Sequence, residues 1–283
     1  MFRDSSSNNM PEGPEVRIAA DRIAKAIANK PIKEIFFAFE HLKLYEEILV
    51  KQMITGVDTK GKGMLIRFDN GLSIYSHNQL YGKWTIRKAY NYPETKRQLR
   101  LAIHNERKSA LLYSASDIEV LDEKAIAVHP FLSRLGLDVL NEQTTTRKVK
   151  ARLLSKSFHR RRFTSLLLDQ SFLAGLGNYL RSEILFVGRV HPTLRPVDCS
   201  QTQISALAKA ALIIPRQSYQ TKGITNDLKL VPKLKAEGYQ RQDYRHWVFG
   251  REERPCYVCN ASIIKDVSGG RRYYYCPECQ KAK

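Results

Sequence analysis

The sequence has little negative charge and no long apolar run. It contains 28 Asp and Glu against 47 Lys and Arg, a formal charge of +19 at pH 7. Because a solvated surface does not need so unequal a balance, the excess predicts a polyanionic partner, although charge alone does not separate DNA from RNA or an acidic membrane. No stretch approaches the ~18 apolar residues that span a bilayer, and the first residues lack the apolar core of a signal peptide. We therefore expect an intracellular, cytoplasmic protein without a membrane partner.

Cysteine is scarce and unevenly placed. Of five cysteines, Cys199 stands alone and the others form two C-x-x-C pairs, Cys256/Cys259 and Cys276/Cys279, near the C-terminus. Each pair can place two thiolates on one metal ion, and the segment between the pairs is long enough for a hairpin. This spacing favours one closed, tetrahedral zinc site over a disulfide framework, a redox pair or an iron–sulfur cluster. A closed site has no open coordination position, so the zinc ion is expected to be structural.

The hydrophobic pattern divides the rest of the chain. A helical period begins at Pro14, where Pro and Glu15 suit the first turn of a helix. Many short β-like runs follow between residues 32 and 114 and predict a sandwich or barrel, with a hairpin turn at 69–71. A mostly helical region comes next, with helices expected at 147–158, 163–173, 178–187 and 201–214.

These patterns predict a multidomain α+β protein. We expect an N-terminal β-sandwich with a leading helix over residues 10–135, a helical domain over 136–245 and a zinc ribbon over 246–283, preceded by a tail of residues 1–9. Residues 218–244 are polar and lack periodicity, which predicts a flexible loop leading into the ribbon.

The glycine-rich segment 174–180 joins two of the expected helices. Its glycines suit a tight turn, and Asn178 suits a helix cap. The alternative interpretation is functional: free N–H groups at the mouth of the second helix, together with the Asn178 amide, would bind a phosphate.

Three further segments have both a structural and a functional interpretation. Lys62 lies in a short turn between strands, which is most simply a β-turn. The exposed trio Gln79, Leu80 and Tyr81 follows a strand and suits insertion into a base stack. Arg271 follows two glycines between the cysteine pairs, where it is either an exposed turn residue or a phosphate ligand at a rigid hairpin tip.

Together these segments resemble the Fpg/Nei family of DNA glycosylases with AP-lyase activity. The resemblance rests on the Pro-Glu-Gly-Pro-Glu segment that begins at Pro11, the lysine turn, the sequence GLGNYLRSEIL at 175–185 and the four-cysteine tail, and it runs from Met10 to about Gln280. Residues 76–82 are similar to the bacterial endonuclease VIII branch, which removes oxidised pyrimidines. The resemblance implies a helix-two-turn-helix domain, double-stranded damaged DNA as the partner, and a monomer.

The resemblance also implies catalytic roles. The nitrogen of Pro11 would attack C1′ of the damaged nucleotide, and the ordinary pKa of an α-amino group leaves a usable neutral fraction near neutral pH. Glu12 would handle protons during base loss and ring opening, held by the mouth of the helix beside it. Lys62 would donate a proton and lead into β-elimination, and Arg271 would contact phosphate and serve δ-elimination.

The remaining implied roles concern DNA. Asn178 would bind a backbone phosphate, Arg134 would contact DNA, and the wedge residues Gln79, Leu80 and Tyr81 would fill the gap left by a flipped nucleotide. The zinc ion would position the Arg271 hairpin without taking part in bond breaking.

This chemistry depends on where the functional chain begins. If residues 1–10 precede Pro11, its nitrogen is a tertiary amide and cannot attack C1′. We expect the functional protein to begin at Pro11, after initiation at Met10 and removal of the methionine, with residues 1–9 a start-site artefact or cut away. The alternatives are an Fpg-like glycosylase for oxidised purines, or a non-catalytic zinc protein that binds damaged DNA if Pro11 is not exposed.

Overall fold

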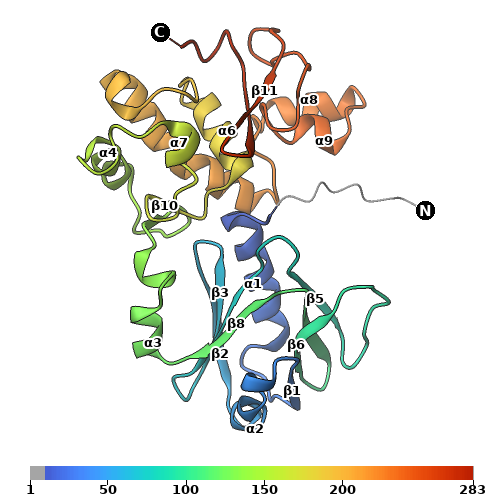
Figure 1. Cartoon of the computed structure of the whole chain (residues 1–283). Coiled ribbons are helices and arrows are strands. Elements are labelled where there is room, and N and C mark those ends of the chain that lie inside the picture. Colours follow the sequence, from blue (N-terminus) through green and yellow to red (C-terminus); the bar gives the residue numbers. More distant parts are fainter. Residues whose placement is uncertain (1–9, 283) are drawn as a thin grey trace. The chain divides into compact units, whose positions relative to one another are not determined.

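The structure, a computed structural model, describes residues 10–282 (Figure 1), so the expected tail of residues 1–9 lies outside the described residues. The contacts divide the chain into two compact units. The sandwich unit contains Pro11 and Glu15–Arg134, and the helix–ribbon unit contains Glu12–Pro14 and Leu135–Lys283. The helical region and the cysteine-rich tail, which we expected as separate domains, thus belong to one unit.

The leading helix begins at Gly13, one residue before the expected Pro14. Helix α1 (Gly13–Ile27) has Glu15 in its first turn, where a carboxylate is favourable. Its buried side includes Val16, Ala20 and Ile23, spaced three or four residues apart as an amphipathic helix requires. The expected helix is confirmed.

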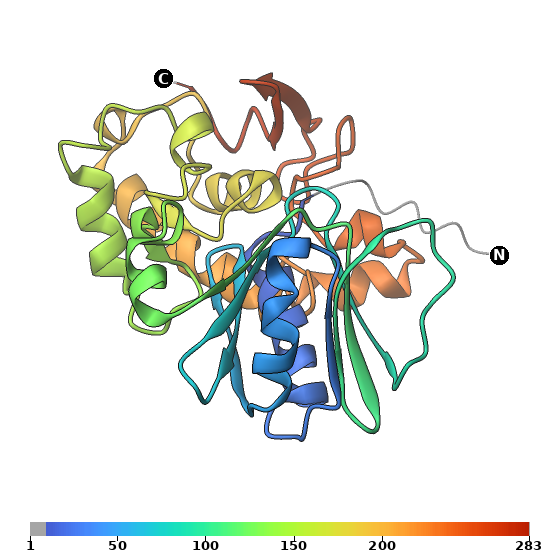
Figure 2. The same cartoon turned by 60° about the horizontal axis from the view of Figure 1, so that its bottom comes forward.

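Two four-stranded antiparallel sheets form the sandwich unit, in the orders β1-β6-β7-β5 and β2-β3-β4-β8. One core contains apolar side chains from both sheets and from α1 and α2, and Figure 2 shows these helices, in blue, between the sheets. The expected β-sandwich with a leading helix is confirmed. The elements are β1 (Glu34–Phe37), η1 (Glu40–Leu42), α2 (Leu44–Val50), β2 (Ile54–Lys60), β3 (Gly63–Phe68), β4 (Ser73–His77), β5 (Lys83–Lys88), β6 (Leu99–His104), β7 (Lys108–Tyr113), β8 (Asp117–Leu121), α3 (Glu123–Val128) and η2 (Leu132–Arg134).

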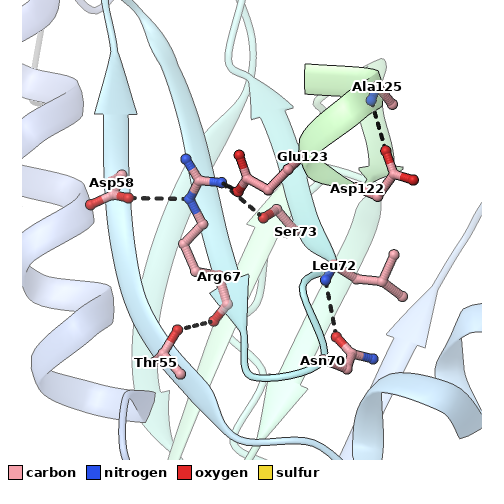
Figure 3. A network of polar contacts seen from close by, with 9 residues as sticks. All are labelled: Thr55, Asp58, Arg67, Asn70, Leu72, Ser73, Asp122, Glu123 and Ala125. Atoms are coloured by element: carbon pink, nitrogen blue, oxygen red, sulfur yellow. Dashed lines mark hydrogen bonds and ion pairs between the residues drawn. The ribbon is translucent and has the colours of Figure 1, made fainter. Parts of the chain in front are cut away.

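A polar network ties β3 to its neighbours (Figure 3). The Arg67 guanidinium lies between Asp58 of β2, at 3.1 Å, and Glu123 at the start of α3. The carboxylate of Asp122 accepts a hydrogen bond of 2.7 Å from the backbone N–H of Ala125 and so caps α3. These contacts fix the path of the chain where it leaves the second sheet.

The main core of the helix–ribbon unit includes side chains of the helices together with Tyr274, Cys256 and Cys276 of the C-terminal segment. Helix α6 is buried along nearly its whole length. No helix among residues 10–282 combines the length and the apolar character needed to cross a bilayer. The elements of this unit are β9 (Leu137–Asp138), α4 (Thr146–Leu154), α5 (Phe163–Leu166), β10 (Leu173–Ala174), α6 (Asn178–Val187), η3 (Pro196–Asp198), α7 (Gln201–Gln220), α8 (Leu230–Ala236), α9 (Arg241–Tyr244), β11 (Ile264–Ser268) and β12 (Arg271–Tyr275).

The expected helix at 163–173 is wrong beyond Leu166. Helix α5 ends there because two polar side chains bind the following backbone. Asp169 accepts a 2.8 Å hydrogen bond from the N–H of Ser171, and the Gln170 side chain accepts one of 3.0 Å from the N–H of Gly175. Such side-chain bonds offer the backbone an alternative to the helix. The expected helix at 147–158 likewise ends early, at residue 154.

The flexible loop expected at 218–244 is also wrong. The segment contains the last turn of α7, then α8 and α9, which pack around a small core of Ile224, Val231, Leu234 and Tyr244. Helix α7 itself continues past Pro215, where the sequence suggested a stop. Its last turns are held by tertiary contacts, including hydrogen bonds of 3.0 Å from Arg216 to the carbonyls of residues 141 and 144.

Candidate active site

Glu12 is buried, with 3% of its surface exposed, at the mouth of α6. Its carboxylate accepts backbone hydrogen bonds from Gly177 at 2.7 Å, Tyr179 at 2.9 Å and Leu180 at 3.2 Å. The first turn of a helix carries unpaired N–H donors and the positive end of the helix dipole, so it is complementary to a carboxylate. The expectation that a helix mouth holds Glu12 is met by α6, more than 160 residues away in the sequence, rather than by the neighbouring α1.

Two glycines of the segment 174–180 make room for this contact. A Cβ atom on Gly177 would lie 2.4 Å from Cδ of Glu12, closer than any real carbon contact. The carbonyl of Gly175, whose φ is +98°, accepts a 2.8 Å hydrogen bond from the N–H of Gly13. The glycine-rich turn therefore accommodates the chain around Glu12.

The phosphate site expected at this turn needs correction. The N–H groups of Gly177, Tyr179 and Leu180 are not free, because Glu12 binds all three. Asn178 is not the cap either: the capping position is Gly177, without a side-chain cap. Asn178 itself is half-buried in the first turn of α6, and its contact with DNA stays a prediction.

Arg181, on the next turns of α6, is completely buried. Its guanidinium donates to the carbonyl of Thr164 and to the carbonyls of Arg271 and Arg272, the latter two at 3.4 and 2.9 Å. Burial lowers the pKa of Arg181 to about 10, and the charge of Glu12 partly opposes this effect. Arg181 therefore remains a cation at neutral pH, bound to the start of β12.

Arg271 begins β12 directly after the hairpin glycines Gly269 and Gly270, whose φ values are +56° and +72°. Its side chain is exposed, and its backbone carbonyl accepts the hydrogen bond from Arg181. The N–H of Tyr274 donates to Oγ of Ser182 at 3.1 Å, a second bond between β12 and α6. One helix thus holds Glu12 with its first turn and the Arg271 strand with its side chains.

The four clustered cysteines lie where a metal site was expected. The Sγ atoms of Cys256, Cys259, Cys276 and Cys279 lie within 4.8 Å of one another, with separations of 3.9, 3.3 and 3.6 Å for the pairs 256–279, 259–276 and 259–279. A tetrahedral ion with bonds of about 2.3 Å to sulfur requires sulfur–sulfur separations of about 3.8 Å. The donor atoms and their spacing therefore fit a metal ion bound by four thiolates.

In the sandwich unit, Lys62 lies in the tight turn between β2 and β3, beside Gly61, whose φ is +60°. Gly63 is paired with His77 at the end of β4. Burial and the nearby charge of Lys62 lower the pKa of His77. Lys62 and the end of β4 therefore lie at the same end of the second sheet.

Pro11, the proposed nucleophile, is half-buried and belongs to the sandwich unit.

The wedge residues leave β4 at this end of the sheet. Gln79 has a φ of +46°, and Leu80 and Tyr81 expose 55% and 62% of their surface. The Gln79 amide accepts a 3.0 Å hydrogen bond from Oγ of Ser116 and also bonds the carboxylate of Asp117. Leu80 and Tyr81 are thus large, exposed side chains in a loop that is anchored at Gln79, as insertion into DNA would require, although the insertion stays a prediction.

Arg134 lies at the end of η2 and is exposed. Its Nε donates to the carbonyl of Pro130, one turn earlier, so part of the guanidinium is held by the backbone. Its contact with DNA also stays a prediction.

Comparison with known proteins decides the family. The Formamidopyrimidine-DNA glycosylase N-terminal domain matches residues 10–116, and the Formamidopyrimidine-DNA glycosylase H2TH domain matches residues 135–229. The chain is 46% identical over 272 residues to Endonuclease 8 of Salmonella arizonae and equally to that of Salmonella typhimurium strain LT2, an alignment that covers 96% of this chain and 100% of each relative. The chain belongs to the Fpg/Nei family. Members of this family are bifunctional DNA glycosylases and AP lyases of base excision repair.

Solved Fpg/Nei structures have the same fold. MutM in complex with DNA containing carbocyclic 8-oxo-G superposes with a TM-score of 0.78 at 21% identity, and Lactococcus lactis Fpg in complex with DNA containing an oxidised pyrimidine superposes with 0.79 at 20%. Each superposition covers 96% of this chain and 100% of the other. The helical region that follows the sandwich in the sequence contains the match to the helix-two-turn-helix domain of the family, over residues 135–229.

Two charged residues of this Fpg/Nei chain were missed by sequence reasoning, Arg181 and Glu183 of α6. Both have no exposed surface. Glu183 accepts hydrogen bonds from the N–H groups of Trp247, Val248 and Phe249 at 2.8 to 2.9 Å, and so holds the segment that enters the ribbon. The sequence signal that could have revealed them is a pair of opposite charges, Arg181 and Glu183, within a mostly apolar helix. Charged side chains are rarely buried unless they form ion pairs or hydrogen bonds, so such a pair indicates structural contacts.

Proposed function

We propose that this protein removes oxidised pyrimidines from double-stranded DNA through a Schiff base on Pro11 and then nicks the strand by β,δ-elimination. The similarity to Endonuclease 8 along the whole chain supports the pyrimidine specificity. The observation that carries the catalytic part is the binding of Glu12, the residue next to Pro11, by three N–H groups of a helix that also holds the Arg271 strand.

In the proposed reaction the Pro11 nitrogen attacks C1′, the bond from C1′ to the base breaks, and an iminium ion forms. Glu12 accepts and returns protons during base loss and ring opening, and the fixed N–H donors of α6 keep its carboxylate in one position. Lys62 donates a proton, after which β-elimination breaks the bond to the 3′ phosphate. Arg271 binds phosphate and serves the δ-elimination that releases the 5′ side.

DNA is the proposed partner of the exposed cations and of the wedge. Flipping the damaged nucleotide leaves a gap in the stack, and we propose that Gln79, Leu80 and Tyr81 fill it. Asn178 would bind a backbone phosphate, and Arg134 would also bind DNA. In a bacterium, this substrate places the enzyme in the cytoplasm with the nucleoid.

The metal of the four-cysteine cluster is proposed to be zinc. Cys256, Cys259, Cys276 and Cys279 would provide four thiolates, the ligand set of structural zinc sites. The ion would hold the ends of the β11–β12 hairpin together and take no part in bond breaking. The ion would therefore serve the reaction only by keeping Arg271 in position.

Borohydride trapping on a duplex containing 5-hydroxyuracil or an abasic site tests the proposal. A chain that begins at Pro11 should give a covalent adduct, and a chain that retains residues 1–10 should give none, because its Pro11 nitrogen is an amide. Intact-mass measurement of each sample identifies the first residue. An active sample that retains Phe2–Asn9, or a chain beginning at Pro11 that gives no adduct, would contradict the proposed nucleophile.

Paired cleavage assays on oxidised pyrimidine and 8-oxoguanine duplexes test the specificity. The comparison is needed because Lactococcus lactis Fpg has been solved with an oxidised pyrimidine as well. We expect faster excision of the pyrimidine, and a preference for 8-oxoguanine would overturn this part of the proposal.

A further inference from the structure

A basic pocket of about 680 Å³ opens on the sandwich unit beside the C-terminal half of α1. Five of its ten lining residues are Lys or Arg, against 47 of 283 in the whole chain. The cations come from α1, from the segment that follows it, from the turn between β6 and β7 and from the first residue of β7. The size lies within the range of ligand-binding pockets, about 300–1,000 Å³.

The pocket is separate from the proposed catalytic residues of this unit. The N–H of Asn29, just after α1, donates to the carbonyl of Ile54 at 2.8 Å, which places the end of α1 beside the start of β2. Lys62 follows the far end of β2, a seven-residue strand that is about 20 Å long. Lys25 lies about 18 Å along α1 from its first residue, which follows Pro11 by two positions. The pocket and the residues Pro11 and Lys62 are therefore at opposite ends of α1 and β2.

Most of the cations are not used within the protein. Nζ of Lys30 donates to the carbonyls of residues 25 and 26, at 2.6 and 3.0 Å, and so satisfies the end of α1. Within the described part of the chain, no ion pair involves Arg22, Lys25, Arg107 or Lys108. The one acidic lining residue, Glu106, is bound to a lysine outside the pocket at 3.0 Å. Four neighbouring like charges repel one another and favour a bound anion.

The interior of the pocket is unsuited to a nucleotide. Its apolar lining comes from Ala26, Pro31 and Ile86, and its ten lining residues include no aromatic ring on which a base could stack. The helix end beside it is the C-terminus of α1, the negative end of the helix dipole, which disfavours a phosphate inside the pocket. The arrangement instead suits a ligand with an apolar group inside and carboxylates at the rim.

We propose that this pocket binds an acidic peptide segment of a partner protein, with a large apolar side chain in the pocket and carboxylates on Arg22, Lys25, Arg107 and Lys108. Recognition of acidic segments by clustered cations, combined with an apolar anchor in a pocket, is a common mode of peptide binding. The proposal does not depend on the glycosylase chemistry.

Fluorescence anisotropy with a labelled peptide of sequence Asp-Asp-Asp-Asp-Leu-Phe tests the proposal on the whole protein. The double variant Lys25→Glu/Arg107→Glu should bind the peptide at least about tenfold more weakly. The matched control, Lys96→Glu/Lys124→Glu, changes two exposed lysines of the same unit that do not line the pocket, and it lowers the net charge equally. Lys96 precedes the end of β6 that is opposite to the pocket. The affinity of this control should fall by less than about twofold, since exposed charges outside the pocket are screened by salt.

The apolar anchor and the competition with DNA are tested separately. A peptide that ends in Ala-Ala should bind at least about tenfold more weakly than one that ends in Leu-Phe. The pocket variant should bind and cleave damaged duplex DNA as the wild type does. Equal weakening in both double variants, indifference to the apolar residues, or loss of DNA binding in the pocket variant would each overturn the proposal, the last by assigning the cations to the DNA surface.

Discussion

Replacement of Gly177 by alanine is the sharpest test of how Glu12 is held. The new Cβ would lie 2.4 Å from Cδ and 2.5 Å from Oε1 of Glu12. Since ordinary carbon contacts begin near 3.4 Å, the carboxylate must move by about 1 Å. The φ of Gly177 is −144°, which alanine adopts without strain, so the expected effect is steric.

The movement has two measurable consequences. Hydrogen bonds to a charged group contribute about 1.5–3 kcal/mol each, so loss of the two longer bonds to Glu12 should destabilise the helix–ribbon unit by about 3–6 kcal/mol. For a unit of this size, the lower bound corresponds to a fall in melting temperature of about 6–12 °C. A displacement of about 1 Å at a catalytic group can reduce the rate about 100-fold. Single-turnover excision of 5-hydroxyuracil and a thermal melt measure the two effects.

Gly56 provides the matched control. A Cβ on this residue of β2 would meet no heavy atom within 4 Å, so Gly56→Ala makes the same chemical change without displacing a neighbour. We expect its excision rate to stay within about twofold of the wild type, as for most changes away from packed or catalytic positions. Excision by Gly177→Ala at the wild-type rate would refute the argument that this glycine exists to admit Glu12.

Three other outcomes are expected. Arg181→Met should reduce strand nicking by about tenfold or more by freeing the Arg271 hairpin, with the zinc content unchanged; equal nicking would contradict the positioning role. Burial, with the charges of Arg245 and Arg241, lowers the pKa of His246 well below its usual range. The folded protein should therefore keep its full stability above about pH 6.5 and lose stability as the pH falls below this value, because the unfolded chain then binds a proton that the buried ring does not. Thermal melts at and below about pH 6.5 should show a smaller loss of stability for His246→Gln than for the wild type. Removal of the metal by a chelator should weaken DNA binding and lower the melting temperature, and returned zinc should restore both.

The strands and the cysteine site could be predicted because their signals are local. Short β-like runs separated by polar turns define most of the sandwich, and two C-x-x-C pairs define the ligand set. The early end of α5 at Leu166 could not be predicted from the sequence, because it depends on Asp169 and Gln170, whose side chains bind nearby backbone groups that a longer helix would use. The apolar spacing of this segment is equally compatible with both structures.

The position of Glu12 could not be predicted because it depends on a contact between residues far apart in the sequence. The sequence 174–180 indicates a helix mouth with free N–H donors, and only the fold shows that a carboxylate of the same chain binds them. The small helices within 218–244 escaped detection for a related reason. They are too short for a hydrophobic period, and polar residues such as Asn226 are buried there through hydrogen bonds to the backbone.

The binding of Glu12 and β12 by the same helix limits how the protein can be recombined. Because Arg181 and Ser182 of α6 hold the strand of Arg271, a chimera that takes its ribbon from a relative must take α6 as well. The first turn of that helix must in turn suit the incoming Glu12. The unit of exchange between relatives is therefore the N-terminal Pro-Glu-Gly segment, α6 and the ribbon together, although more than 250 residues separate its ends.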